Sequence, residues 1–220
     1  MSVQVVVGAN RGIGLELVRQ LRGEGYTVVG VCRTSSPELA ATGCEVVDGV
    51  EITKPDSVAT LAAELSGRSI ALLVVAAGIL KRTGLDALDL EVVREQLEVN
   101  AIGPLSVARA LLPAVKRGGR IVFLTSRMGS IADNSSGGHY GYRMSKAALN
   151  AAAKSLALDL RPREISVGIL HPGFVRTDMT GGHGDLSAEE SARLLLQRID
   201  ELGPATSGAF LHANGQVLPW

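Results

Sequence analysis

The sequence is poor in cysteine, in aromatic residues and in any excess of charge. Its 220 residues include two cysteines, Cys32 and Cys44, and 3% aromatic residues. Two thiols are too few for a disulfide framework or a four-ligand zinc site. The 22 lysines and arginines balance 22 aspartates and glutamates, so the basic surplus typical of nucleic-acid-binding proteins is missing. We therefore expect no metal site and no nucleic-acid partner.

Long apolar runs are also missing from the sequence. No stretch reaches the roughly 18 residues that a membrane span needs. The first ten residues lack the basic region and the longer apolar stretch of a signal peptide. Yet 46% of the residues are apolar, which is enough to bury a sizeable core. These features predict a cytoplasmic protein without a membrane partner, folded as a single domain over residues 1–220.

Short β-branched segments alternate with longer segments of helical period. The expected strands are 3–7, 27–31, 45–47, 70–75, 120–125, 165–170 and 208–212. The expected helices are 12–23, 55–66, 88–116, 141–160 and 187–200. Such alternation favours a parallel sheet with right-handed crossovers. The sequence thus predicts the α/β class, with one doubly wound sheet of about seven strands and helices on both faces.

Glycine, by contrast, is abundant, with 26 residues. The first expected strand leads directly into a glycine loop, residues 8–14, which opens a helix. Glycines there allow a tight turn and a close approach of the backbone to phosphate oxygens, and the helix N-terminus favours an anion. The loop is spaced G-x-x-x-G-x-G. We predict that it binds the phosphates of a dinucleotide through Gly8, Asn10, Arg11, Gly12, Ile13 and Gly14.

The end of the second expected strand indicates which dinucleotide is bound. An acidic residue at that position would accept hydrogen bonds from the ribose hydroxyls of NAD. This sequence has Arg33 there instead, and Arg11 lies within the glycine loop. Two cations that converge on a 2′-phosphate favour NADP(H). The alternative is that both arginines are solvated surface charges.

Four residues form a candidate catalytic group. Tyr142 and Lys146 are four residues apart and so share one helix face, where an ammonium would lower the pKa of the phenol. The phenol would then donate or accept the proton of an alcohol. Ser126 ends an expected strand and can donate to a carbonyl oxygen. Asn100 interrupts a long apolar-periodic segment, which predicts a helix kink or a buried amide bonded to the backbone, and either can accompany a role in catalysis.

The chain resembles the short-chain dehydrogenase/reductase family over essentially its whole length. The resemblance rests on a set of motifs in the right order, Gly8-x-x-x-Gly12-Ile13-Gly14, Ala77-Gly78, Asn100, Ser126, Tyr142-x-x-x-Lys146 and Pro172-Gly173. It implies a Rossmann-like fold and a catalytic tetrad of Asn100, Ser126, Tyr142 and Lys146. In that tetrad Tyr142 is the acid/base and Asn100 holds a water of the proton relay. Residues 135–150 and 214–220 are most similar to the C-factor and sniffer-like carbonyl-reductase branch.

The resemblance also implies further contacts to the cofactor. They fall to Arg33, Glu51, Ile52, Ala77, Gly78, Asn100, Tyr142, Lys146, Pro172, Gly173, Val175 and Thr177. The sequence departs from the family pattern at Val7, which stands where threonine is usual, at Val75-Ala76, which replace an asparagine pair, and at Glu51, which replaces an aspartate. These changes affect residues around the cofactor and leave the tetrad intact.

Together these features predict an NADP(H)-dependent oxidoreductase that interconverts a carbonyl and an alcohol. The expected partner is a small-molecule carbonyl or alcohol substrate. The alternative is an NADP-binding sensor or signalling protein of the same fold with little turnover. The helices at 101–115 and 141–160 are expected to form a homodimer or homotetramer, unless their small residues serve only to pack them against the sheet.

Overall fold

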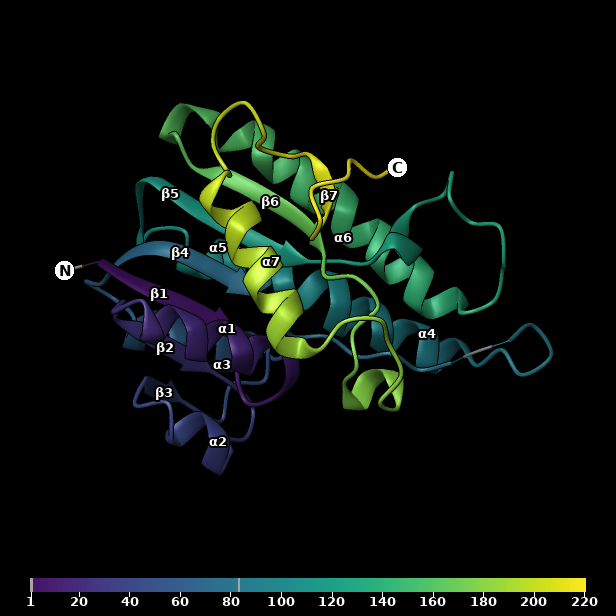
Figure 1. Ribbon diagram of the computed structural model, residues 1–220, viewed down its shortest axis with the longest axis horizontal. Helices are drawn as coiled ribbons and strands as arrows, with labels where there is room; N and C mark the ends of the chain where they lie inside the picture. The colour runs from purple at the N-terminus through teal and green to yellow at the C-terminus, as the bar shows by residue number, and fades with distance from the viewer. Residues whose placement is uncertain (1, 83) are drawn as a thin grey trace.

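The computed structural model describes residues 2–82 and 84–220. It contains a sheet of seven parallel strands (Figure 1), β1 (Ser2–Val7), β2 (Val28–Val31), β3 (Glu45–Val47), β4 (Ser69–Val75), β5 (Val115–Leu124), β6 (Ser166–His171) and β7 (Phe210–His212). The strand order is β3-β2-β1-β4-β5-β6-β7. The order reverses between β1 and β4, and open α/β sheets bind ligands outside the carboxyl ends of the strands at such a point. The predicted doubly wound fold is confirmed.

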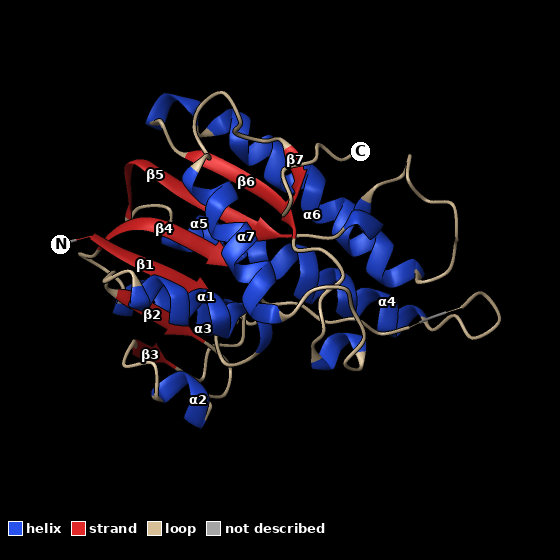
Figure 2. Ribbon diagram, viewed as in Figure 1, coloured by secondary structure: helices blue, strands red, loops and turns tan. Residues whose placement is uncertain are grey.

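Helices cover both faces of this sheet (Figures 1 and 2). They are α1 (Gly12–Gly23), α2 (Pro37–Ala40), α3 (Pro55–Glu64), α4 (Leu90–Leu97), α5 (Gly103–Leu111), α6 (Tyr140–Asp159) and α7 (Ala188–Asp200). Buried side chains of α1, α2 and α7 form one apolar cluster. Those of α3, α5 and α6 form a second cluster on the other face. None of the helices in the described residues has the length and apolar character needed to cross a membrane.

The alternation of side chains along β1 explains why its sequence is apolar throughout. Successive residues of a strand point to opposite faces. Val5 and Val7 accordingly join the cluster beneath α3, α5 and α6, and Val6 joins the cluster beneath α1 and α7. All three are almost completely buried. Because both faces of β1 are covered, its sequence lacks the alternation of apolar and polar residues that marks a half-exposed strand.

The single helix expected over 88–116 is wrong in two respects. The structure divides it into α4, a π-helical turn over Glu98–Ile102, and α5, which ends at Leu111. Leu112 keeps helical dihedral angles, with φ of −54° and ψ of −36°, but Pro113 has no amide N–H with which to continue the helical hydrogen bonds, and β5 begins at Val115. The strand therefore starts five residues before the expected 120. Gly118, with φ of 72°, lies in the irregular first part of this strand.

The two long loops of the chain, residues 127–139 and 174–186, contain more structure than their glycine and serine content suggests. The turn Arg127–Gly129 follows β5 as 3₁₀ helix, and a second 3₁₀ turn over Asp178–Thr180 follows β6. Main-chain bonds close the second loop at its base, because Asp185 and Leu186 both donate to the carbonyl of Phe174. The sequence also gave no indication of the short helix α2.

Burial of α1 against the sheet should account for a large part of the stability. Leu17 is fully buried in the cluster beneath α1 and α7. We expect Leu17→Ala to lower the free energy of unfolding by about 2–5 kcal/mol, because it loses transfer free energy and leaves a cavity. Urea denaturation measures this change. Leu158→Ala, at an exposed position of α6, is the control, and an equal loss in both variants would contradict the assignment.

Candidate active site

The carboxamide of Asn100 connects three segments at the carboxyl end of the sheet. Asn100 is fully buried within the π-helical turn. Its Oδ1 accepts from the amide of Ile79 at 2.8 Å, and its Nδ2 donates to the carbonyl of Ile79 at 2.9 Å. Nδ2 also lies 3.0 Å from Oγ of Ser145 on α6. π-Helical turns are frequent at functional sites, and here the turn points an amide inward. The predicted kink and backbone-bonded amide are confirmed.

Helix α6 places Tyr142 and Lys146 beside the end of β5. Nζ of Lys146 donates to the carbonyl of Leu124 at 3.0 Å and lies 5.8 Å from the centre of the Tyr142 ring. Both residues are buried, as is Ser126 two positions after Leu124. Oγ of Ser126 accepts from the amide of Met128, which fixes the first turn of the following loop. The structure thus brings together the expected serine, tyrosine and lysine.

Burial dominates the electrostatics of this group. It raises the pKa of Tyr142, and a hydrogen bond with the Ser126 hydroxyl partly opposes the rise. It lowers the pKa of Lys146 to about 8. Desolvation of the phenolate therefore outweighs the influences that lower this pKa, and the effect of the ammonium together with the positive charge of an oxidised nicotinamide stays a prediction. The phenol is protonated at neutral pH, the form that can donate a proton.

His171 lies near these residues as a neutral imidazole. It ends β6 and packs edge-on against His212 of β7, with ring centres 4.9 Å apart. Burial lowers its pKa to about 3, helped by the neighbouring His212, Arg127 and Lys146. His171 therefore remains uncharged at neutral pH and does not compete with Tyr142 for the proton.

The glycine loop lies directly against the end of β4. A Cβ on Gly8, whose φ is 90°, would lie 2.6 Å from the amide nitrogen of Ala77, and one on Gly14 would lie 2.1 Å from the carbonyl oxygen of Gly8. Side chains at these two positions would therefore clash with backbone. The first turn of α1 has no acidic residue, so its free amide groups can donate hydrogen bonds to an anion. Ile13 packs against the cluster beneath this helix.

The two arginines expected to share a phosphate point to different carboxylates. Nη1 of Arg11 lies 3.2 Å from Asp178 in the loop after β6, and Nη1 of Arg33 lies 3.3 Å from Glu51. Their convergence on one point is not found. All but one of these four side chains are mostly exposed, Glu51 being the exception. Exposed ion pairs contribute little stability, so either arginine can exchange its partner.

The remaining predicted cofactor residues lie along the same edge of the sheet. A Cβ on Gly78 would come within 3.1 Å of Oδ1 of Asn100 and 3.6 Å of Nζ of Lys146. A side chain at this position would therefore crowd these two residues of the tetrad. Thr177 faces Gly12 across the switch point. Buried Ile52 packs against Gly103. The carbonyl of Pro172 accepts a hydrogen bond from the hydroxyl of Ser191. Gly173 and Val175 both lie against Leu186.

Two polar pairs near the tetrad escaped the sequence reasoning. Oγ of Ser145 donates to the carbonyl of Tyr142 at 2.8 Å and accepts a hydrogen bond from Nδ2 of Asn100. One turn beyond Lys146, the Oδ1 of Asn150 accepts from the hydroxyl of Thr125 at 2.6 Å. Both Ser145 and Asn150 are buried on the same face of α6 as Leu149 and Ala153, and a polar residue on such a face is a signal that the sequence carries.

Comparison with known proteins gives a consistent family. The model of the short chain dehydrogenase family matches residues 2–186. The chain is 41% identical to 1-hydroxy-2-glutathionyl-2-methyl-3-butene dehydrogenase of Rhodococcus sp. strain AD45, with both chains fully covered. It is 49% identical over 124 residues to C-signal of Myxococcus xanthus, which covers 56% of this chain and 75% of that protein.

Several solved structures of similar chains are carbonyl reductases. Carbonyl reductase Sniffer of D. melanogaster superimposes with a TM-score of 0.91 at 30% identity, covering 100% of this chain and 99% of its own. The NADPH-bound carbonyl reductase from chicken fatty liver gives a TM-score of 0.90 at 33% identity, with 100% and 98% covered. The similarity to C-factor and sniffer-like proteins expected from the sequence is confirmed.

The buried ammonium should make stability depend on pH. Because the pKa of Lys146 is about 8 in the folded protein against an ordinary 10.5, the unfolded chain binds more protons between these values. The free energy of unfolding therefore gains about 2–3 kcal/mol from this group as the pH rises from 7.5 to 10.5. Lys146→Met should lose that gain in urea denaturation across this range.

Lys116→Met, at an exposed site, is the control for the loss of one positive charge. A pH dependence shared by Lys146→Met and the wild type would show that another group is responsible.

Proposed function

The chain belongs to the short chain dehydrogenase family, and from this premise we propose that it is an NADP(H)-dependent carbonyl reductase. The observation that carries the proposal is that Ser126, Tyr142 and Lys146 lie together, with Gly78 facing Lys146 and Asn100. The carbonyl reductases of similar structure support the reaction class, and the NADPH bound to one of them supports the cofactor. The enzyme would act in the cytoplasm.

The residues present fit a dinucleotide. The glycine loop and the free amides of α1 suit the phosphates, and a Cβ on Gly78 would fill the space that faces Asn100 and Lys146. Arg11 and Arg33 are the cations available to a 2′-phosphate, once each gives up its carboxylate. Thr177, opposite Gly12, would hold the carboxamide end of the cofactor.

NADP(H) supplies the hydride when bound, and the protein handles the proton. Tyr142, whose pKa is raised by burial, donates its phenolic proton to the carbonyl oxygen as the alcohol forms. The Ser126 hydroxyl orients that oxygen and stabilises negative charge on it. The Lys146 ammonium, buried beneath the ring, stabilises the phenolate once the proton has left.

The substrate is expected to be a small carbonyl compound. The loop after β6 is held compact at its base by Arg176, which donates to the carbonyls of Gly184 and Asp185. A loop closed by its own bonds contributes little surface for a large ligand and leaves the mouth of the site open. Selective turnover of one bulky steroid-like ketone would contradict this expectation.

A second candidate function is that of an NADP-binding sensor or signalling protein with little turnover. The identity with C-signal favours it. The retention of Asn100, Ser126, Tyr142 and Lys146 in one buried arrangement favours the enzyme, because a sensor needs no proton donor. We further propose a homodimer or homotetramer formed through the helices at 101–115 and 141–160, where Ile102, Leu105 and Met144 are exposed.

Replacement of Tyr142 by phenylalanine tests the catalytic assignment. The variant keeps the ring and loses the proton donor, so we expect kcat/KM to fall by about 100-fold to 10,000-fold. Oxidation of NADPH against a panel of aldehydes and ketones measures the change. Tyr140→Phe, two positions earlier on α6, is the matched control and should retain activity. Equal activity in all three proteins would contradict the role of Tyr142, whereas no turnover of any substrate by the wild type would favour the sensor.

Arg33→Ala tests the choice of cofactor. Loss of a charge-assisted bond to a phosphate corresponds to roughly tenfold to 100-fold in affinity, so the Kd for NADPH should rise by that factor. The Kd for NADH should change less than about twofold. Calorimetric titration of both cofactors provides the measurement. Arg117→Ala removes the ion pair of a similarly exposed arginine with Glu164 and should alter neither Kd, whereas equal weakening of both cofactors by Arg33→Ala would rule out the 2′-phosphate contact.

A further inference from the structure

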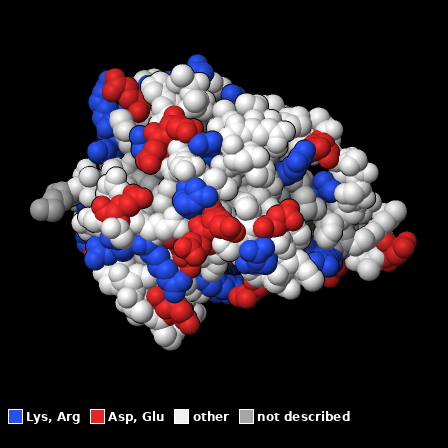
Figure 3. All heavy atoms as spheres, in the orientation of Figure 1, with Lys and Arg blue, Asp and Glu red and all other residues white. Residues whose placement is uncertain are grey.

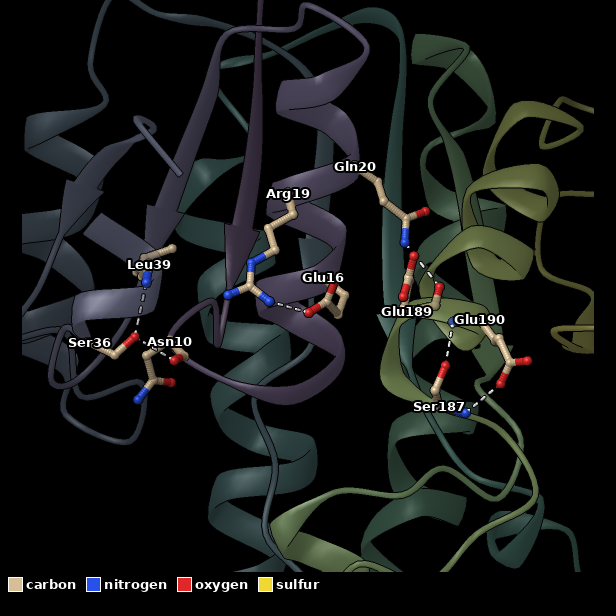
Figure 4. Close-up of polar contacts among 9 residues, drawn as sticks. All are labelled: Asn10, Glu16, Arg19, Gln20, Ser36, Leu39, Ser187, Glu189 and Glu190. Carbon is tan, nitrogen blue, oxygen red and sulfur yellow. Dashed lines mark hydrogen bonds and ion pairs between the residues drawn. The ribbon is translucent and has the colours of Figure 1, made fainter. Parts of the chain in front are cut away.

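The segment between β2 and α2 touches the glycine loop through one hydroxyl group. Oγ of Ser36 donates to the carbonyl of Asn10 at 2.7 Å and accepts from the amide of Leu39 at 3.1 Å (Figure 4). It therefore caps α2 and at the same time binds the loop that precedes α1. The two segments that carry Arg33 and Arg11 are joined at this point.

Helix α2 is a firm support for this contact despite its four residues. Leu39 is fully buried in the cluster that also holds Ala9 of the glycine loop. A Cβ on Gly30 of β2 would lie 3.1 Å from Leu39 and 3.3 Å from the Cβ of Ala9, so the glycine leaves room for both. The hydroxyl of Ser36 thus connects two segments whose apolar side chains are already packed together.

The backbone on either side of Arg33 is held as well. The amide of Cys32 donates to Val47, and the carbonyl of Arg33 accepts from Gly49 at 3.2 Å. The stretch from Arg33 to Ser36 is therefore fixed to β3 at one end and to Asn10 at the other. The exposed Arg33 side chain can move between Glu51 and any other anion.

We propose that Ser36 is a positioning residue for NADP(H): its hydroxyl sets the spacing between the Arg33 segment and the glycine loop, and so places the backbone of Arg33 for the 2′-phosphate. The inference rests on the proposed NADP(H) binding. Preorganised contacts increase affinity because less order is lost on binding. A ligand without the 2′-phosphate gains nothing from the spacing, since the phosphates at α1 depend on the glycine loop itself.

Ser36→Ala should raise the Kd for NADPH by about threefold to tenfold, as expected for one neutral hydrogen bond, and change the Kd for NADH less than twofold. Calorimetric titration measures both. Ser36→Thr keeps the hydroxyl and should restore the wild-type Kd for NADPH. Thr42→Ala is the matched control, because Thr42 also donates to a carbonyl, that of Leu39, and accepts from an amide, that of Cys44, at the other end of α2. It should alter neither Kd.

The double variant Arg33→Ala/Ser36→Ala separates the inference from its premise. If Ser36 acts through Arg33, its effect on NADPH disappears in the Arg33→Ala background, as a double-mutant cycle reports. Equal weakening of NADPH and NADH by Ser36→Ala, an effect that persists without Arg33, or no effect at all would overturn the inference while Arg33→Ala still discriminates the cofactors. Loss of discrimination in Arg33→Ala itself would overturn the proposed cofactor and the inference together.

Discussion

The arrangement of the site depends on the carboxamide of Asn100, which is bonded to both main-chain groups of Ile79 and to Ser145. Each bond contributes only about 1 kcal/mol net, whereas a buried amide left without partners costs roughly 1–3 kcal/mol. The chain therefore has to keep the end of β4, the π-helical turn and α6 in one relative position. Ser145 passes this constraint on to Tyr142, whose carbonyl it binds. The position of the Tyr142 backbone is thus tied to a residue 42 positions earlier in the chain.

Close backbone packing then brings β5 to the same place. A Cβ on Gly129 would lie 2.8 Å from the main chain of Lys146, so the turn after Ser126 can rest directly on α6. This contact buries the Lys146 ammonium against the carbonyl of Leu124. Burying a charge opposes folding, and the low pKa of Lys146 expresses that cost. The same burial makes the charge effective, because an ammonium acts more strongly on a phenolate when water is excluded.

The sequence predicted those features that depend on local pattern. Strands apolar on both faces and the turn at Gly8 follow from neighbouring residues, as does the interruption of a helix at Asn100. The end of α5 was misplaced because the apolar period continues to Val115 although Pro113 stops the helix. The partners of Arg11 and Arg33 could not be predicted, since Asp178 lies 167 positions from Arg11 and only the fold brings them within 3.2 Å. The contact of Ser36 with Asn10 depends in the same way on the pairing of β1 and β2.

The equal numbers of acidic and basic residues are reflected in how the charges are distributed on the surface. On the face seen in Figure 3, lysines and arginines are interspersed with acidic residues, and the arginines at the cofactor edge follow this rule by pairing with Asp178 and Glu51. Such exposed pairs are worth about 0–1 kcal/mol, while a charge-assisted bond to a phosphate is stronger. Exchange of carboxylate for phosphate is therefore favourable for Arg33, provided that its backbone is already in place. A protein without net charge lacks the electrostatic attraction that favours binding of a polyanion. It can still bind a single phosphate, because that binding depends on where individual arginines lie.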